Sequence, residues 1–137
     1  MYPPELVAPM SQDLTNNGFQ GLQTVEAVDD FMKNMEGTAL LVVNSVCGCA
    51  AANARPGAKM AMQNEKVPMQ AATVFAGVDR EATERAREYL LPYPPSSPSI
   101  ALFQDGKLVH FIERHHIEGR AAEIIAANLK MAFDKYC

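Results

Sequence analysis

Residues 40–57 read LLVVNSVCGCAAANARPG, and this stretch decides which fold the sequence favours. Its first part is short, continuously apolar and partly β-branched, which is typical of a buried strand. Its second part is rich in alanine, the residue with the highest intrinsic helix propensity. Cys47 and Cys49 therefore lie where a predicted strand passes into a predicted helix, with only Gly48 between them.

The segments on either side of this stretch predict an α/β protein. A βαβ unit followed by a β-hairpin and a final helix implies a mixed central sheet with helices on both faces, a three-layer α/β/α arrangement. We expect one domain over 1–137, with the helices of about 4–36 as an N-terminal extension. Strands are expected over 38–45, 71–76, 99–103 and 108–113. Helices are expected within 4–20, ended by Asn16-Asn17-Gly18, and over 24–36, from 47 onward, 80–90 and 119–135.

Prolines interrupt this pattern at two places. Pro56 lies inside the helix predicted to start near Cys47, where a proline removes a hydrogen bond and kinks or splits the helix. Four prolines in the segment PYPPSSP, residues 92–98, exclude helix and regular strand. Pro98 therefore stands just before the strand expected over 99–103.

Composition limits the possible partners and compartment. The chain has 137 residues, 48% hydrophobic and 20% charged, with a net charge of -4, so it can form a core but offers no basic excess for nucleic acid or anionic membrane. No apolar run approaches the roughly 18–20 residues of a membrane span, and the N-terminus does not read as a signal peptide. We therefore expect a cytoplasmic protein that binds neither nucleic acid nor membrane.

The cysteine pair can be read as chemistry. A helix N-terminus stabilises a thiolate through its unpaired N–H groups and its dipole, so the pKa of Cys47 is expected to be lowered. Gly48 gives the backbone the freedom to bring the two sulfurs together. A Cys-x-Cys disulfide closes a smaller ring than Cys-x-x-Cys, which predicts a less reducing couple than thioredoxin's. This favours exchange or isomerisation over strong reduction.

Other interpretations of the cysteines remain open at this stage. Three cysteines in a reducing compartment do not indicate a disulfide scaffold, but two buried, inert thiols are possible. A metal site would need more ligands, and the candidates lie far away without ligand spacing, so we expect no metal. Those candidates are His110, His115, His116 and Cys137.

Several polar residues near the pair have both functional and structural interpretations. Asn44 and Ser45 either bond near the thiolate or simply close the end of the strand. Arg55 could lend positive charge to the site, but two helical turns beyond Cys47 an exposed, solvated arginine is expected. We expect His115 and His116 to be surface residues and Cys137 to be a nonessential thiol.

The segments VVNSVCGCAAANARP, PSSPSIALF and DGKLVHFIERHHIEG, with the terminal Cys137, resemble the bacilliredoxin family over nearly the whole chain. That family has a thioredoxin fold and a Cys-Gly-Cys motif. In the thioredoxin fold a cis-proline faces the active-site cysteines, and Pro98 matches its position. The chain departs from ordinary thioredoxins in its one-residue spacer and in having no Trp.

The resemblance implies thiol–disulfide exchange on proteins capped by bacillithiol or a related low-molecular-weight thiol, which acts as co-substrate in place of a bound cofactor. Cys47 would attack the mixed disulfide and take the cap, and Cys49 would be the partner or resolving thiol. Pro98, with Ser97 and Gly48, would shape a groove that offers a backbone edge to an extended peptide.

We expect a monomer or weak dimer whose partners are protein mixed disulfides and the small thiol. Two alternatives remain: a protein disulfide isomerase, and a redox-sensing or metal-binding module without turnover.

Overall fold

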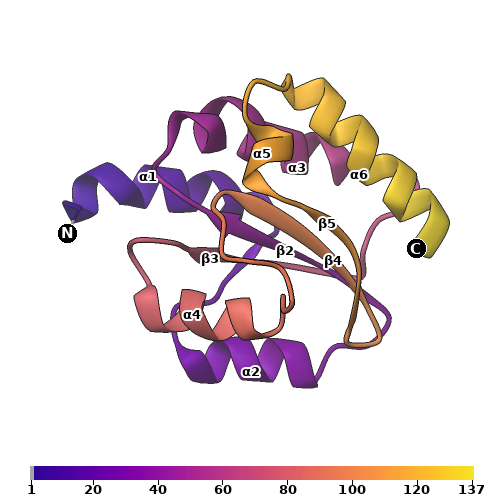
Figure 1. Ribbon diagram of the computed structural model, residues 1–137, viewed down its shortest axis with the longest axis horizontal. Helices are drawn as coiled ribbons and strands as arrows, with labels where there is room; N and C mark the ends of the chain where they lie inside the picture. The colour runs from indigo at the N-terminus through magenta and orange to yellow at the C-terminus, as the bar shows by residue number, and fades with distance from the viewer. Residues whose placement is uncertain (1) are drawn as a thin grey trace.

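A mixed sheet of five strands forms the middle of the computed structural model, which describes residues 2–137 (Figure 1). Its strands are Gln20–Gly21 (β1), Thr38–Asn44 (β2), Gln70–Phe75 (β3), Ser99–Gln104 (β4) and Lys107–Ile112 (β5). They lie in the order β1-β3-β2-β4-β5. The β1–β3 and β3–β2 pairs are parallel, whereas β4 is antiparallel to both β2 and β5.

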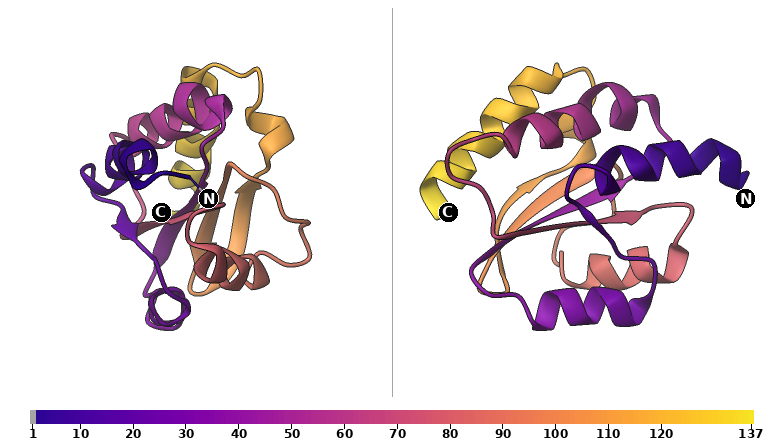
Figure 2. Two further views of the ribbon diagram at one scale, coloured as in Figure 1. Left: turned by 90° about the vertical axis from the view of Figure 1, so that its left-hand side faces the viewer. Right: turned by 180° about the vertical axis from the view of Figure 1, so that it is seen from behind.

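Helices cover both faces of the sheet (Figures 1 and 2). The helices of one face are Pro4–Thr15 (α1), Arg55–Ala61 (α3) and Ala122–Tyr136 (α6), and those of the other are Val25–Lys33 (α2) and Arg80–Glu88 (α4). The short helix Arg114–Ile117 (α5) follows β5 directly. The prediction of a three-layer α/β fold with a mixed sheet is therefore confirmed.

The central strand β2 carries an uninterrupted apolar run because its side chains are buried on both faces of the sheet. Successive side chains of a strand point to opposite faces of its sheet. Leu40 and Val42 join the core cluster beneath α3 and α6, while Leu41 and Val43 join the cluster against α2 and α4. Because helices cover both faces, all seven residues of β2 are buried.

The helix after the cysteines was predicted to kink or split at Pro56; it stays continuous from 48 to 61 but changes its hydrogen-bond pattern just before Pro56. Residues Ala50–Ala54 (η1) form a π-helical segment, and α3 continues from Arg55 with Pro56 in its first turn. Because helical turns precede Pro56, its missing N–H removes one bond from the ladder where the π-helical segment passes into α3. The N–H of Arg55 donates instead to the carbonyl of Ala50, which closes the wider turn.

Two short elements were not predicted, β1 and α5. β1 has only two residues and α5 only four, too few for a periodic pattern to be recognised. The hydroxyl of Thr24 caps α2 by accepting the N–H of Ala27 at 3.1 Å, and the helix, expected over 24–36, ends already at Lys33. Among residues 2–137, no helix combines the length and apolar character that a membrane crossing requires.

Replacing Gly57 by alanine is expected to destabilise the fold. A Cβ at this position would lie 2.7 Å from Ile125 Cγ2 and 3.2 Å from the Ala122 carbonyl oxygen, so α3 and α6 would have to move apart. Overpacking of this kind costs about 1–3 kcal/mol, more than the gain in helix propensity of about 1 kcal/mol. Urea denaturation should show the loss.

Gly48→Ala is the matched control, because a Cβ there meets no atom within 4 Å. It should not lower the unfolding free energy when measured in the same redox state. A Gly57→Ala protein as stable as the wild type would show that α3 and α6 are not in close contact.

Candidate active site

Cys47 and Cys49 lie just beyond the end of β2, where the chain enters its next helix. The carbonyl oxygen of Cys47 accepts the N–H groups of Ala50 at 3.0 Å and Ala51 at 3.3 Å, so Cys47 stands at the start of the helical turns. The two cysteines form a disulfide across Gly48, with their Cα atoms 5.3 Å apart. Both are half-buried, so the alternative of two fully buried, inert thiols is wrong.

The sulfur of Cys47 accepts two hydrogen bonds. The backbone N–H of Cys49 donates to it at 3.3 Å, and Nη2 of Arg114 donates at 3.3 Å. Donors and positive charge next to a sulfur favour its thiolate form once the disulfide is reduced. The pair therefore has an environment suited to a nucleophilic Cys47.

Arg114 was missed by the sequence analysis, although the predicted hairpin contained a signal. Because β4 and β5 are antiparallel, the start of one strand lies beside the end of the other. Val43 at the end of β2 pairs with Ser99, and Ile100 pairs with Ile112, so the residues after Ile112 come to the edge that holds the cysteines. A cation just after the return strand was therefore a candidate site residue.

The loop before β4 reaches the same place. The Ser97–Pro98 peptide bond is cis, the isomer that the resemblance associates with this position, and Pro98 is buried. Nη1 of Arg114 donates to the Ser97 carbonyl oxygen at 3.1 Å. Arg114 thus joins the proline loop to the sulfur of Cys47, while its Nε pairs with Glu118.

Arg55 is buried, and the expectation of an exposed, solvated arginine was wrong. Only 5% of its surface is accessible. Its Nη1 donates to Asn44 Oδ1 at 3.0 Å and to the Ser45 carbonyl oxygen at 3.2 Å, and its Nε donates to Asp13 Oδ2 at 3.2 Å. A buried guanidinium needs such partners, and here α1 supplies the carboxylate.

Asn44 and Ser45 hold the turn that leads into Cys47. Asn44 Nδ2 donates to the Met10 carbonyl oxygen at 3.2 Å, and its Oδ1 accepts the N–H of Ser45 at 2.9 Å. The Ser45 hydroxyl oxygen accepts the N–H of Cys47 at 3.2 Å. These bonds fix the backbone before Cys47, and none of them reaches its sulfur.

Asp13 anchors this network from α1. Burial raises the pKa of the Asp13 carboxyl, but the hydrogen bonds and charges of Lys59 and Arg55 outweigh burial, so the net pKa lies below its ordinary value of 3.8. Asp13 is therefore ionised at neutral pH and balances the charge of the guanidinium beneath the cysteine turn.

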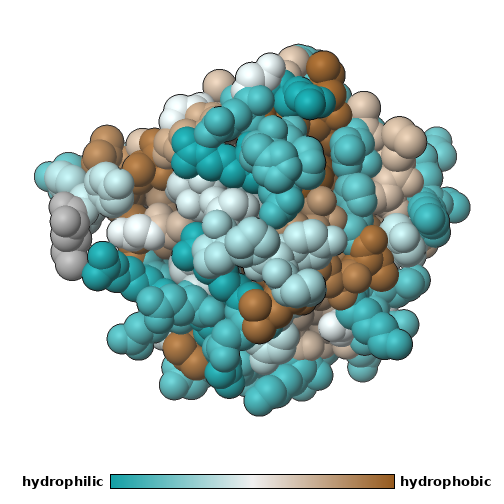
Figure 3. Space-filling view, viewed as in Figure 1, coloured by the Kyte–Doolittle hydropathy of each residue, from teal (hydrophilic) through white to brown (hydrophobic). Residues whose placement is uncertain are grey.

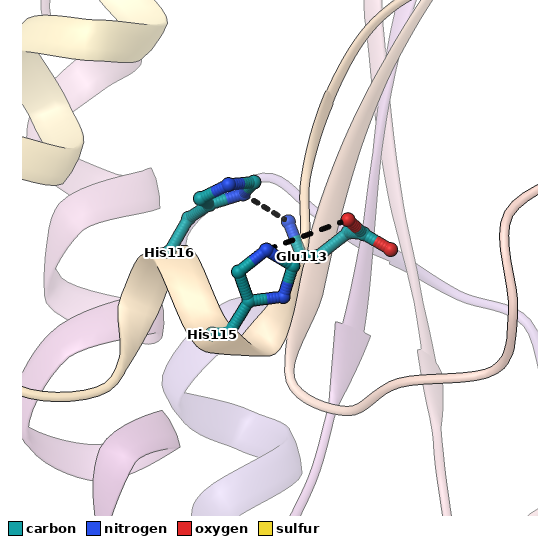
Figure 4. A group of neighbouring side chains, drawn as sticks. All are labelled: Glu113, His115 and His116. Carbon is teal, nitrogen blue, oxygen red and sulfur yellow. Dashed lines mark hydrogen bonds and ion pairs between the residues drawn. The ribbon is translucent and has the colours of Figure 1, made fainter.

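The structure brings Glu113, His115 and His116 together, with one possible ligand atom from each within 4.8 Å of the others (Figure 4). Both histidines are exposed, as expected. Glu113 and His116 also cap α5, with the N–H of Glu113 donating to His116 Nδ1 at 3.4 Å. Separately, His115 Nε2 lies 3.7 Å from Glu113 Oε2. Hydrophilic side chains cover the surface over α5 (Figure 3).

Cys137 is an exposed free thiol at the end of α6. The 15 residues of α6 separate it from the segment after α5, a length of roughly 22 Å at the α-helical rise. The structure therefore does not bring Cys137 to the cysteine pair.

Solved structures share the fold at low sequence identity. A thioredoxin from Fasciola hepatica superposes with a TM-score of 0.60 at 16% identity, covering 87% of this chain and 100% of that one. A thioredoxin from Halobacterium salinarum gives 0.61 at 17% identity, covering 88% and 91%. The chain therefore has the thioredoxin fold, with a disulfide-forming cysteine pair at the start of the helix that follows β2.

Proteins of similar sequence identify the family of this chain within the thioredoxin fold. A family model described as "Disulphide isomerase" matches residues 2–137. A bacilliredoxin of Cytophaga hutchinsonii is 61% identical over 98% of this chain and 99% of its own length. Bacilliredoxins of Koribacter versatilis (51% identity, 100% and 94%) and Bacillus cereus (53%, 99% and 95%) are also similar. The chain belongs to the bacilliredoxin family.

Proposed function

We propose that this protein removes bacillithiol, or a related low-molecular-weight thiol, from protein mixed disulfides in the cytoplasm. The observation that carries the proposal is the half-buried Cys47 sulfur, which accepts bonds from Arg114 and from the N–H of Cys49. The names of the similar bacilliredoxins support the same reaction class.

The first step transfers the cap. The Cys47 thiolate attacks the cap sulfur of the mixed disulfide, so a Cys47–cap disulfide forms and the bond between cap and substrate protein breaks. The substrate cysteine leaves as a thiolate and takes a proton from water. Arg114 and the Cys49 N–H, which hold Cys47 Sγ at 3.3 Å each, stabilise the charge of the attacking thiolate.

The second step releases the cap. The Cys49 thiolate attacks Cys47 Sγ, the cap leaves as a thiolate, and the Cys47–Cys49 disulfide of the structure forms. The substrate cysteine has been reduced, and the enzyme is now oxidised by two electrons. A thiol or dithiol reductant must reduce it before the next turnover.

Disulfide isomerisation is the second candidate, favoured by the description of the matching family. An isomerase would rearrange a scrambled protein disulfide without net consumption of reductant, whereas cap removal consumes one reductant equivalent per cap. Counting reductant against product distinguishes the two reactions. A reduction potential as low as thioredoxin's would count against both and for a general reductase.

Replacing Cys49 by alanine is expected to trap the intermediate. Without the second thiol, the cap on Cys47 has no intramolecular path of release, so about one cap per protein should accumulate after mixing with a capped peptide. Mass spectrometry of the intact protein and of its peptides measures the amount and the position. A cap on Cys137, or no cap in the variant, would contradict the assigned order of attack.

Cys137→Ala is the control for this experiment, because Cys137 is exposed but far along α6. It should leave both the trapping by the Cys49→Ala variant and the turnover of the otherwise wild-type protein unchanged.

A further inference from the structure

The guanidinium of Arg114 is shared between two parts of the active site. One terminal nitrogen donates to Cys47 Sγ at 3.3 Å and the other to the Ser97 carbonyl oxygen at 3.1 Å. The backbone N–H of Arg114 also reaches Ser96 Oγ at 3.5 Å. Arg114 thus lies between the attacking sulfur and the loop that precedes Pro98.

In this position Arg114 occupies the Ser97 carbonyl oxygen, a backbone acceptor that an extended peptide would need. Peptides that dock in extended form do so by hydrogen-bonding to free main-chain groups beside the site. The carbonyl of Ser97, directly before cis-Pro98, already accepts a bond from a charged donor. A peptide chain that pairs with Ser97 must first displace Arg114, at the cost of a charge-assisted hydrogen bond.

The same guanidinium remains accessible to a small anion. The Arg114 side chain is 45% exposed, and its partner Glu118 is 51% exposed. Exposed ion pairs of this kind are weak, about 0–1 kcal/mol, so Glu118 does not prevent a second carboxylate from binding. In the hydrogen bonds of residues 2–137, Arg114 is the charged side chain that reaches Cys47.

We propose that Arg114 selects the substrate at Cys47, favouring low-molecular-weight thiol caps that carry a carboxylate over extended peptide disulfides. This inference rests on the proposed function. When Cys47 attacks a cap, the cap sulfur comes into bonding distance of Sγ, and a carboxylate a few bonds further on reaches the same guanidinium. Arginine and carboxylate match as a planar, two-point pair, which lysine cannot reproduce.

A simpler role for Arg114 makes a different prediction. A residue that only stabilised the Cys47 thiolate would change the rate with every substrate by the same factor. Substrate selection changes the ratio of rates between substrates. The test therefore compares the rates of different substrates within each variant. The pKa of the Cys47 thiol, measured from thiolate absorbance, corrects for the rate change that all substrates share.

The experiment uses one short peptide whose single cysteine is capped either by mercaptopropionate, which carries a carboxylate, or by mercaptoethanol, which does not. A second peptide with an internal disulfide represents the extended substrate. Wild type, Arg114→Gln and Arg114→Lys are compared by kcat/KM for all three. Arg120→Gln, an exposed arginine just after α5, is the matched control.

We expect Arg114→Gln to lower the preference for the carboxylate cap over the neutral cap about tenfold or more. Arg114→Lys should lose part of this preference, and Arg120→Gln none of it. Reaction with the internal peptide disulfide, corrected for the pKa change, should stay the same or increase. The proposal would be overturned if Arg114→Gln lowered kcat/KM equally for both caps. It would also be overturned if kcat/KM for the peptide disulfide, corrected for the pKa change, fell as much as that for the carboxylate cap.

Selection by Arg114 can still be tested if the proposed function is wrong. Should wild-type protein remove neither cap catalytically, reduced Cys49→Ala protein, in which an adduct on Cys47 is not released by Cys49, is mixed with the symmetric disulfides of mercaptopropionate and mercaptoethanol. Mass spectrometry then gives the ratio of the two Cys47 adducts. A ratio that favours the carboxylate adduct in Cys49→Ala and falls when Arg114→Gln is added supports selection by Arg114, whereas an unchanged ratio overturns it.

Discussion

Replacing Cys47 by alanine is expected to abolish catalysed exchange, with kcat/KM for a capped peptide falling by on the order of 10³-fold or more. Cys47 is the sulfur at the helix start that Arg114 and the Cys49 N–H both contact. Without it the site loses its activated nucleophile. Following release of the cap from a peptide by mass spectrometry measures the loss.

Cys49 does not replace Cys47 in this variant. Within residues 2–137, Arg114 donates to Cys47 Sγ and no hydrogen bond is donated to the sulfur of Cys49, so Cys49 is the less activated thiol. Cys137→Ala, treated identically, should turn over at the wild-type rate. Unchanged turnover by Cys47→Ala would remove Cys47 from the mechanism and with it the proposed function.

Replacing Arg55 by alanine is expected to lower the free energy of unfolding by about 3 kcal/mol. The substitution removes the donor to Asn44 Oδ1 and to the Ser45 carbonyl, and it leaves Asp13 without its most buried partner. Urea denaturation of the oxidised protein measures this loss. Because Asn44 and Ser45 form the turn before Cys47, exchange should also slow.

Lys59→Ala is the matched control, since Lys59 pairs with the same Asp13 carboxylate but its side chain is 31% exposed. It should cost less than about 1 kcal/mol. If the Arg55 and Lys59 variants lost equal stability, the buried network would not hold the turn.

The network also predicts a pH dependence. The pKa of Asp13 is lowered in the folded state, so its contribution to stability is present above the ordinary value of 3.8. That contribution is lost as the pH falls through the lowered folded-state pKa, because the unfolded state binds the proton first. In Arg55→Ala, stability should depend less on pH in this acidic range.

The sequence alone determined much of the architecture. The apolar run of β2 required burial on both faces and hence helices on both sides of the sheet. The alanines after Cys49 predicted where the next helix begins, and Pro56 predicted where its regular hydrogen bonding is interrupted. The strands expected over 99–103 and 108–113 pair as the predicted hairpin of β4 and β5. These features depend on residues close together in the chain, where propensity and periodicity carry information.

Tertiary structure alone decided the surroundings of the cysteines. Arg55 is buried because Asp13, 42 residues away, supplies its carboxylate, whereas local spacing predicted an exposed side chain. Arg114 reaches Cys47 across 67 residues, because antiparallel pairing returns β5 to the edge where β2 ends. Local patterns do not specify contacts over such separations. They arise only when the layers of the fold pack and the sheet acquires its strand order.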